Sequence, residues 1–308
     1  MPSYTEADLG ADEITRAAAD KPVLSSNSLY TSGSSKWVTG SKTGTVASAN
    51  NQDPDFPASR MTDGFPGYVS KPSSASTLFT VVINRTLSPV EFDWFGLMNH
   101  NLFTLSCTEL RLQIASNSLF STDLITPFTA DISALYASDR RIAGMALETG
   151  GGVARRYGNV QYMRLQITCS SGVPEIGQII LGRRRQQKYN PEVDWGPDNQ
   201  SSAIDRVTTR GGVRYKTARA LGRRDIDAIL VHDDTTLQND LIDWWADIDA
   251  GNQNFFWHDQ PATYPDNFCM FDLNEDTFIY PLIDWKNRKF NLVGSEQGPD
   301  TEYFSQGP

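Results

Sequence analysis

Two segments that alternate between apolar and polar residues constrain the fold of this chain more than any other feature. Residues 109–116 place leucine and isoleucine side chains on one face, and residues 162–169 repeat that pattern. A period of two is typical of a β-strand with one buried face. Further apolar runs of strand length occupy residues 76–84, 92–98 and 175–181. Successive short strands with turn-rich connections predict a β-sandwich or jelly roll.

The last third of the chain has a different pattern. Residues 235–250 are the one strong helical segment, with Leu237, Leu241, Trp244, Trp245 and Ile248 at helical spacing. Segments of strand character surround it, at residues 212–221, 226–231, 254–258, 268–273, 278–283 and 289–293. This order predicts an α+β domain in which one helix covers a face of an antiparallel sheet or open barrel.

Composition shifts divide the chain into four parts. We expect an N-terminal arm (residues 1–24), a β-sandwich (25–187), a linker (188–202) and the α+β domain (203–308). The arm carries a short helical pattern without a strong apolar stripe. The basic cluster of Arg183, Arg184, Arg185 and Lys188 has two interpretations, a solvated strand end or a contact with an acidic face of a neighbouring copy. We favour the solvated strand end.

The charge balance excludes some partners. The 308 residues carry a formal net charge of -10, and an acidic surface repels phosphate backbones, so we expect no nucleic-acid binding. The N-terminus lacks the basic and apolar regions of a signal peptide, and no apolar run reaches the length of a membrane span. Synthesis in the cytoplasm without membrane insertion is therefore expected.

The residues that usually perform chemistry form no recognisable motif. Cys107, Cys169 and Cys269 are far apart, so we expect structural thiols rather than a disulfide framework or a metal site. The histidines lack a nucleophile elbow or a zinc-binding helix motif around them. Asp240, Asp243 and Asp247 are expected on the solvated flank of the helix. The sequence thus predicts no catalytic residue, no metal and no cofactor.

The aromatic segment at residues 255–257 is the main candidate for an interface. Strand alternation places Phe256 on one face and Phe255 with Trp257 on the other. One face belongs to a core, and we expect the other to be buried against another chain.

Several segments of the first two-thirds resemble a discoidin-type jelly roll. These are residues 57–64 (PASRMTDG), 77–83, 96–102 (GLMNHNL), 112–116 and 175–182 (EIGQIILG). The resemblance spans about residues 30–187. In phage genomes such domains usually belong to tail fibres, tail tips or baseplates. The resemblance implies a sandwich whose loops contact ligands, with Asn99, His100 and Asn101 as possible glycan contacts.

Residues 203–308 are similar to the tail-tube-like domain of distal tail and minor tail proteins. The features that carry the resemblance are the helix, the phrase from Gly251 through residues 255–259 (FFWHD), and a final strand with Glu296. That family has a β-barrel flanked by one helix. The resemblance implies a ring, a hexamer or a trimer, that contacts tail-tube and baseplate hub proteins.

Three hypotheses follow. The first is a virion structural protein of a tailed phage, at the distal tail or baseplate. The second is a carbohydrate-binding or adhesin protein that contacts host-surface glycan through loops 50–68 or 99–103. The third, a glycoside hydrolase, requires two carboxyl groups across a cleft, and the sequence places no such pair.

Overall fold

The structure of the chain is a computed structural model. It describes residues 2–32, 39–41, 46–64, 67–87, 89–132, 141–147, 152–190, 198–199, 204–208, 214–218, 224–231, 235–248, 254–263, 268–273 and 289–296. The predicted strand at residues 278–283 lies outside these residues.

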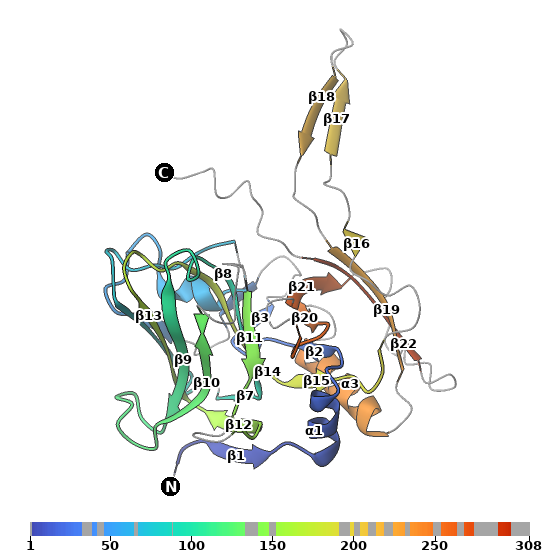
Figure 1. The fold of residues 1–308 in the computed structure, drawn as a ribbon, viewed down its shortest axis with the longest axis horizontal. Helices are drawn as coiled ribbons and strands as arrows, with labels where there is room; N and C mark the ends of the chain where they lie inside the picture. The colour runs from blue at the N-terminus through green and yellow to red at the C-terminus, as the bar shows by residue number, and fades with distance from the viewer. Residues whose placement is uncertain are drawn as a thin grey trace.

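The first half of the structure is a β-sandwich, as predicted (Figure 1). One sheet has the order β10-β9-β13-β6-β5, with bounds Ile125–Asp131, Cys107–Ala115, Tyr162–Cys169, Leu78–Asn84 and Val46–Ala49. The facing sheet has the order β11-β8-β14, with bounds Arg141–Met145, Trp94–His100 and Ile176–Gly182.

The predicted alternation places the core between these sheets. β13 is buried at every second residue, and its apolar side chains pack with those of β9 and β6 in one large cluster. Burying such side chains contributes about 1.5–3 kcal/mol each. Smaller elements complete this half: β3 (Tyr30–Ser32) with β4 (Thr39–Ser41), the 3₁₀ helix η1 (Ala58–Thr62), and β7 (Val90–Phe92) with β12 (Arg155–Val160).

The second half is an α+β unit, also as predicted. Its sheet has the order β15-β2-β20-β21-β22-β19-β16, with bounds Arg184–Gln186, Val23–Ser25, Phe255–His258, Phe268–Leu273, Lys289–Glu296, Arg224–Val231 and Asp198–Asn199. The helix α3 (Thr235–Asp247) buries Leu237, Leu241 and Trp244. The hairpin of β17 (Ile204–Thr208) and β18 (Arg214–Ala218) extends away from this sheet (Figure 1).

The N-terminal segment connects both halves. β1 (Thr5–Asp8) pairs with β12 of the sandwich, and α1 (Ala11–Ala18) follows it. β2 then lies between β15 and β20 in the seven-stranded sheet. Past β2, the chain crosses β14 so closely that a Cβ at Gly182 would lie 1.9 Å from the carbonyl oxygen of Ser26. β2 spans Val23–Ser25, so a single strand contains residues on both sides of the boundary expected between residues 24 and 25.

The two halves meet through a small aromatic cluster. Trp94 of the sandwich packs edge-on against Phe268 at a ring-centroid distance of 5.4 Å and lies 6.1 Å from Phe256. Met98, Ala143, Ile180 and Met270 complete the cluster. The second face of the 255–257 segment is thus covered within this chain, whereas the sequence suggested another chain.

The basic cluster differs from its sequence-based interpretation. Arg185 is 1% exposed, and it donates to Asp247 at 3.0 Å and to the carbonyl of Asp240 at 3.2 Å. Arg16 of α1 pairs with the Asp240 carboxylate at 3.2 Å. The solvated strand end is wrong because β15 is a strand of the second sheet and its arginine meets acidic groups of α3. The acidic face is real, but it belongs to the same chain.

The same contact corrects the interpretation of the helix carboxylates. Burial raises the pKa of both Asp240 and Asp247, although nearby arginines act in the opposite direction. The side chain of Asp240 is 17% exposed and that of Asp247 is 38% exposed, so these two carboxylates do not lie on a fully solvated flank.

A second charged contact ties α1 to the sandwich. Arg156 of β12 donates to Glu13 at 2.7 Å and to the buried Asp93 at 2.9 Å. Burial alone would raise the pKa of Glu13, but hydrogen bonds from the Gly10 N–H and from Arg156 hold it below its usual value. Such paired charges fix how elements dock, because separating them leaves a buried charge without its partner.

Asp259, after β20, gives the structure a pH dependence. Burial, then repulsion from Asp20, raises the pKa of Asp259 to about 6. The folded chain therefore holds this proton more tightly than the unfolded chain, whose aspartates titrate near ~3.9. The contribution of the Asp259 carboxyl to folding stability therefore falls as pH rises from about 4 to about 6.

Asp259→Asn is expected to raise the free energy of unfolding by about 1 kcal/mol at neutral pH, allowing for solvent screening. At pH ~4 the substitution should change the free energy of unfolding little. Urea denaturation at both pH values measures this, and an equal effect at both contradicts it.

Within the described residues, no helix has the length and apolar character needed to cross a membrane.

Candidate functional site

The loops at one end of the sandwich form the candidate site. They are residues 50–64 and 67–73 between β5 and β6, 101–106 between β8 and β9, and 170–175 between β13 and β14. Antiparallel pairing of β6, β13 and β9 brings the ends of these strands together. We call this group of loops the loop cluster.

Hydrogen bonds fix the loops to one another. Nδ2 of Asn101 donates to the carbonyl of Val173 at 3.1 Å, and its Oδ1 accepts from the N–H of Glu175 at 2.8 Å. Ser70 and Ile176 exchange two backbone hydrogen bonds of 2.7 and 3.0 Å. Because backbone and amide groups make these contacts, the loops present a pre-formed surface rather than a loose one.

Two cations and two aromatic rings occupy this surface. The Arg60 guanidinium lies 5.1 Å from the ring centroid of Phe56 and 5.7 Å from that of Tyr68. Nζ of Lys71 lies 3.8 Å from the Phe56 centroid and 3.9 Å from the Glu175 carboxylate. Tyr68 is 42% exposed. Cations stacked on rings lose side-chain freedom in advance, which favours ligand binding.

Local structure explains the position of Arg60. It lies within η1, where it also donates to the carbonyl of Val69 at 3.3 Å. Phe56 lies two residues before η1, and the backbone N–H of Phe56 bonds to Asp53 in a tight turn. The tight turn before η1 therefore brings the ring of Phe56 close to the guanidinium of Arg60.

The predicted loop residues have structural contacts. His100 is 5% exposed, and its Nδ1 accepts from the N–H of Leu102 at 3.3 Å. Asn99 adopts a left-handed backbone with φ of 53°, which asparagine tolerates well. Asn101 lies in the loop cluster and holds two loops together. Contact of these three residues with a glycan stays a prediction.

Phe255 and Trp257 lie elsewhere, in the core of the second half. They are 0% and 3% exposed. Phe255 stacks on Phe271 at 5.5 Å and meets Trp244 of α3 edge-on at the same distance. In this structure other residues of the same chain bury the apolar surface of Phe255 and Trp257.

Phe56, Arg60, Tyr68 and Lys71 were not singled out from the sequence. The hypothesis of glycan contact by loops 50–68 did cover the first three. The sequence signal that could have identified them is the presence of aromatic and basic residues together in an otherwise polar loop.

A disulfide bond closes the base of the loop cluster. Cys107 and Cys169 are bonded, and Cys269 is free and buried. The expectation of structural thiols is therefore wrong for two of the three cysteines. Their separation of 62 residues hides the pair in the sequence, but β9 and β13 place them opposite each other.

Removal of this disulfide is expected to destabilise the sandwich. Changing both Cys107 and Cys169 to Ser frees a long loop in the unfolded chain, and loop-closure entropy predicts a loss of about 4 kcal/mol. Urea denaturation of the double variant, beside Cys269→Ser as control, measures the difference. An unfolding free energy unchanged within about 0.5 kcal/mol would contradict this expectation.

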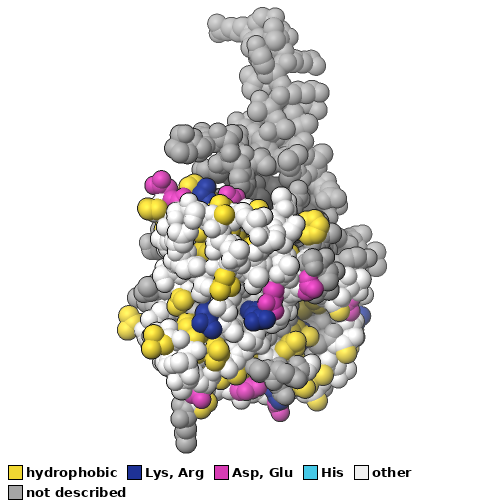
Figure 2. Space-filling model, turned by 60° about the vertical axis from the view of Figure 1, so that its left-hand side comes forward, with side chains coloured by type: hydrophobic (Ala, Val, Ile, Leu, Met, Phe, Trp, Pro, Cys, Tyr) yellow, Lys and Arg dark blue, Asp and Glu magenta, His cyan; other side chains and the backbone are white. Residues whose placement is uncertain are grey.

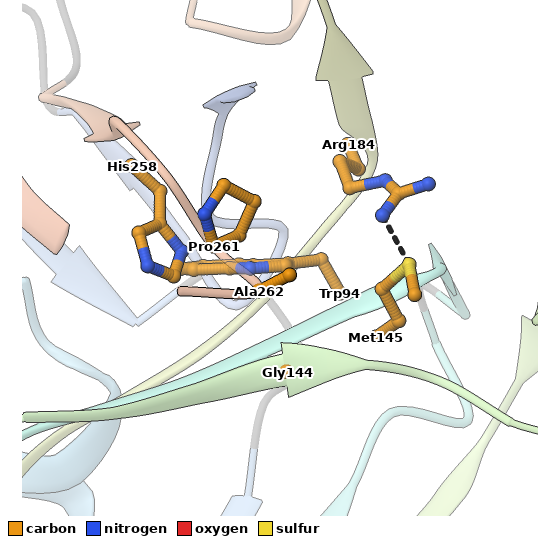
Figure 3. Close-up of a pocket in the computed structure, with 7 residues that line it drawn as sticks. All are labelled: Trp94, Gly144, Met145, Arg184, His258, Pro261 and Ala262. Carbon is orange, nitrogen blue, oxygen red and sulfur yellow. Dashed lines mark hydrogen bonds between the residues drawn. The ribbon is translucent and has the colours of Figure 1, made fainter. Parts of the chain in front are cut away.

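One cavity lies at the junction of the two halves, away from the loop cluster. Its volume is about 100 Å³, and its lining comprises Trp94, Gly144, Met145, Arg184, His258, Pro261 and Ala262 (Figure 3). Arg184 contacts the sulfur of Met145. The lining is mainly apolar, and the cavity adjoins the aromatic cluster that joins the halves.

A metal centre has no support in the part of the chain that the structure describes. There, no three histidine, cysteine, aspartate or glutamate side chains gather closely enough to hold a metal ion.

Comparison with known proteins gives partial similarity of fold. No family model and no curated protein matches the chain. Chitosan-binding module 1, from a chitosanase/glucanase of a Paenibacillus species, is similar with a TM-score of 0.33 at 15% identity, over 45% of this chain and 94% of the module. The family 32 carbohydrate-binding module of Clostridium perfringens NanJ, solved with galactose, gives 0.33 at 12% identity, over 45% and 93%.

A GH29 fucosidase of Ruminococcus gnavus is also similar, with a TM-score of 0.33 at 10% identity. The match covers 48% of this chain and only 26% of the fucosidase. All three resemble this chain over less than half of its length.

Proposed function

We propose that this chain is a carbohydrate-binding protein without catalytic activity, and that its loop cluster contacts the saccharide. The observation that carries the proposal is the exposed ring of Tyr68 beside the stacked Arg60 guanidinium. An aromatic ring offers a flat apolar surface for the C–H face of a sugar. A planar guanidinium offers hydrogen-bond donors for ring and hydroxyl oxygens.

The position of these groups supports the proposal. Both lie on loops at the end of a rigid, disulfide-bonded sandwich, where binding residues commonly occur. The loops are held by Asn101 and by the Ser70–Ile176 backbone contacts, so little ordering is needed when a ligand binds.

A glycan array followed by calorimetric titration tests this function. Tyr68→Ala is expected to weaken binding of the selected glycan about ten-fold, the effect of losing ~1.4 kcal/mol. Tyr189→Ala is the matched control, since Tyr189 is 40% exposed and has a cation, Lys188, 5.2 Å from its ring centroid. Equal affinities for the two variants, or no saturable binding by the full chain, would refute the proposal.

A second candidate function is structural, as a component of a tailed-phage virion at the distal tail or baseplate. The β17–β18 hairpin favours it. A two-stranded ribbon is marginally stable alone, and its open edges can pair with another chain. In that role the chain would form a ring with its own copies and contact tail-tube and hub proteins. Native mass spectrometry tests the ring, and a monomer at micromolar concentration argues against it.

A further inference from the structure

The outer face of the five-stranded sheet carries an unusual set of polar residues. Arg164 of β13 lies opposite Gln113 on β9 and Val82 on β6, and the next outward position on β13, Gln166, lies opposite Arg111 and Thr80. Figure 2 shows this side of the molecule, with two basic side chains near the middle of the surface and an acidic side chain beside one of them. We call this surface the sheet platform.

The side chain of Arg164 is held in one orientation. Its Nε donates to Oε1 of Gln113 at 2.8 Å, and Nε2 of Gln113 donates to Thr126 at 3.3 Å. The guanidinium carbon lies 4.6 Å from the ring centroid of Phe120, which is itself 6% exposed. A turn fixed by hydrogen bonds of Asn117 positions this ring. The fork of the guanidinium is therefore pre-organised.

Among the residues that the structure describes, Arg164 differs from Arg111 and Arg156 in having no carboxylate partner. Arg111 pairs with Glu109 at 2.7 Å, and Arg156 pairs with two carboxylates. In the described parts of the chain, Arg164 has no carboxylate partner, and only its Nε makes a hydrogen bond. Burial lowers the pKa of Arg164, and no anionic group counteracts the effect. An anion placed at Nη1 and Nη2 would remove this penalty.

We propose that the sheet platform binds a saccharide that carries a carboxylate, with the carboxylate on the Nη edge of Arg164. A guanidinium matches a carboxylate with two parallel hydrogen bonds. The neighbouring amide and hydroxyl groups of Gln166, Thr80 and Tyr162 both donate and accept, as sugar hydroxyls require. The platform shares no residue with the loop cluster, so either proposal can fail alone.

Calorimetric titration of the full chain with trigalacturonate, and with its neutral methyl ester, tests this inference. We expect the acid form to bind at least about ten-fold more tightly than the ester, because charge-assisted hydrogen bonds are the stronger ones. Added salt is expected to weaken the acid form selectively. Equal affinities for the two forms would overturn the proposal, as would failure of the acid form to bind.

Variants assign the binding to Arg164. Arg164→Gln is expected to abolish the preference for the acid form, whereas Lys188→Gln, which removes an equal charge at another exposed position, should retain it. Arg164→Lys keeps the charge but loses the planar fork, so we expect most of the preference to be lost. Unchanged thermal unfolding shows that each variant folds. Retained preference in Arg164→Gln rejects the site, and equally tight binding of a tri-glutamate peptide rejects the saccharide.

Discussion

A chain that lacks residues 1–25 is expected to leave the seven-stranded sheet unfolded. The deletion removes β2 from between β15 and β20, so both neighbours lose a row of backbone hydrogen bonds. It also removes Leu24, which is 0% exposed in the second core, and Arg16, the partner of Asp240. Buried backbone groups without partners cost about as much as lost hydrogen bonds, ~1–3 kcal/mol each. Together with the lost core side chain and ion pair, this cost is comparable to the ~5–15 kcal/mol that stabilises a typical domain.

A point substitution isolates the contribution of β2. Leu24→Asp places a carboxylate in an apolar core and is expected to cost more than about 4 kcal/mol. Leu87→Asp is the control, because Leu87 is 81% exposed and its change should stay within about 0.5 kcal/mol. Hydrogen exchange of β20 and β21 amides reports on the sheet directly. Full protection of these amides in Leu24→Asp would contradict the role given to β2.

Strands with a clear period were predictable from the sequence. The segment at residues 162–169 is β13, residue for residue, and 268–273 is β21. The helix expected at 235–250 begins at Thr235 as α3. In β13 and α3 a periodic pattern of apolar side chains matches one buried face, whereas β21 is a short apolar run with both faces buried.

Contacts between distant segments were not predictable in this way. β2 has three residues, too few for a period to be recognised. Its position between β15 and β20 depends on residues more than 150 positions later in the chain. The same limit explains why the burial of Arg185 was not predicted from the sequence. Arginine is mostly exposed in proteins, and only the folded structure shows that Arg185 donates to the Asp240 carbonyl and to the Asp247 carboxylate.

The candidate site was predictable only as a region. Loops at the end of a sandwich are the expected location for binding, and loops 50–68 were named on that basis. The stacking of Arg60 on Phe56 and Tyr68 depends on the turn geometry of η1 and its neighbours. Arg164 had no signal at all, because alternation marks it only as an outward residue of a strand.

Trp94→Ala is expected to loosen the junction of the two halves and to cost about 3–5 kcal/mol. Trp94 is 1% exposed and contacts Phe256 and Phe268 of the other half, so its removal leaves a cavity at the junction. Because Trp94 is the aromatic side chain that the sandwich contributes to this cluster, beside Met98, Ala143 and Ile180, the halves should then unfold in two separate transitions. Calorimetry of the variant measures this separation.

Trp245→Ala provides the matched control for that experiment. Trp245 is half-buried on α3, where it packs against the core of the second half. Its loss should cost less and should lower the stability of one half without separating the transitions. Coupling between the halves also rests on β2, on the ion pairs of α1 and on contacts such as that of Arg141 with Cys269. A single cooperative transition in Trp94→Ala would therefore contradict a dominant role of the aromatic cluster in this coupling.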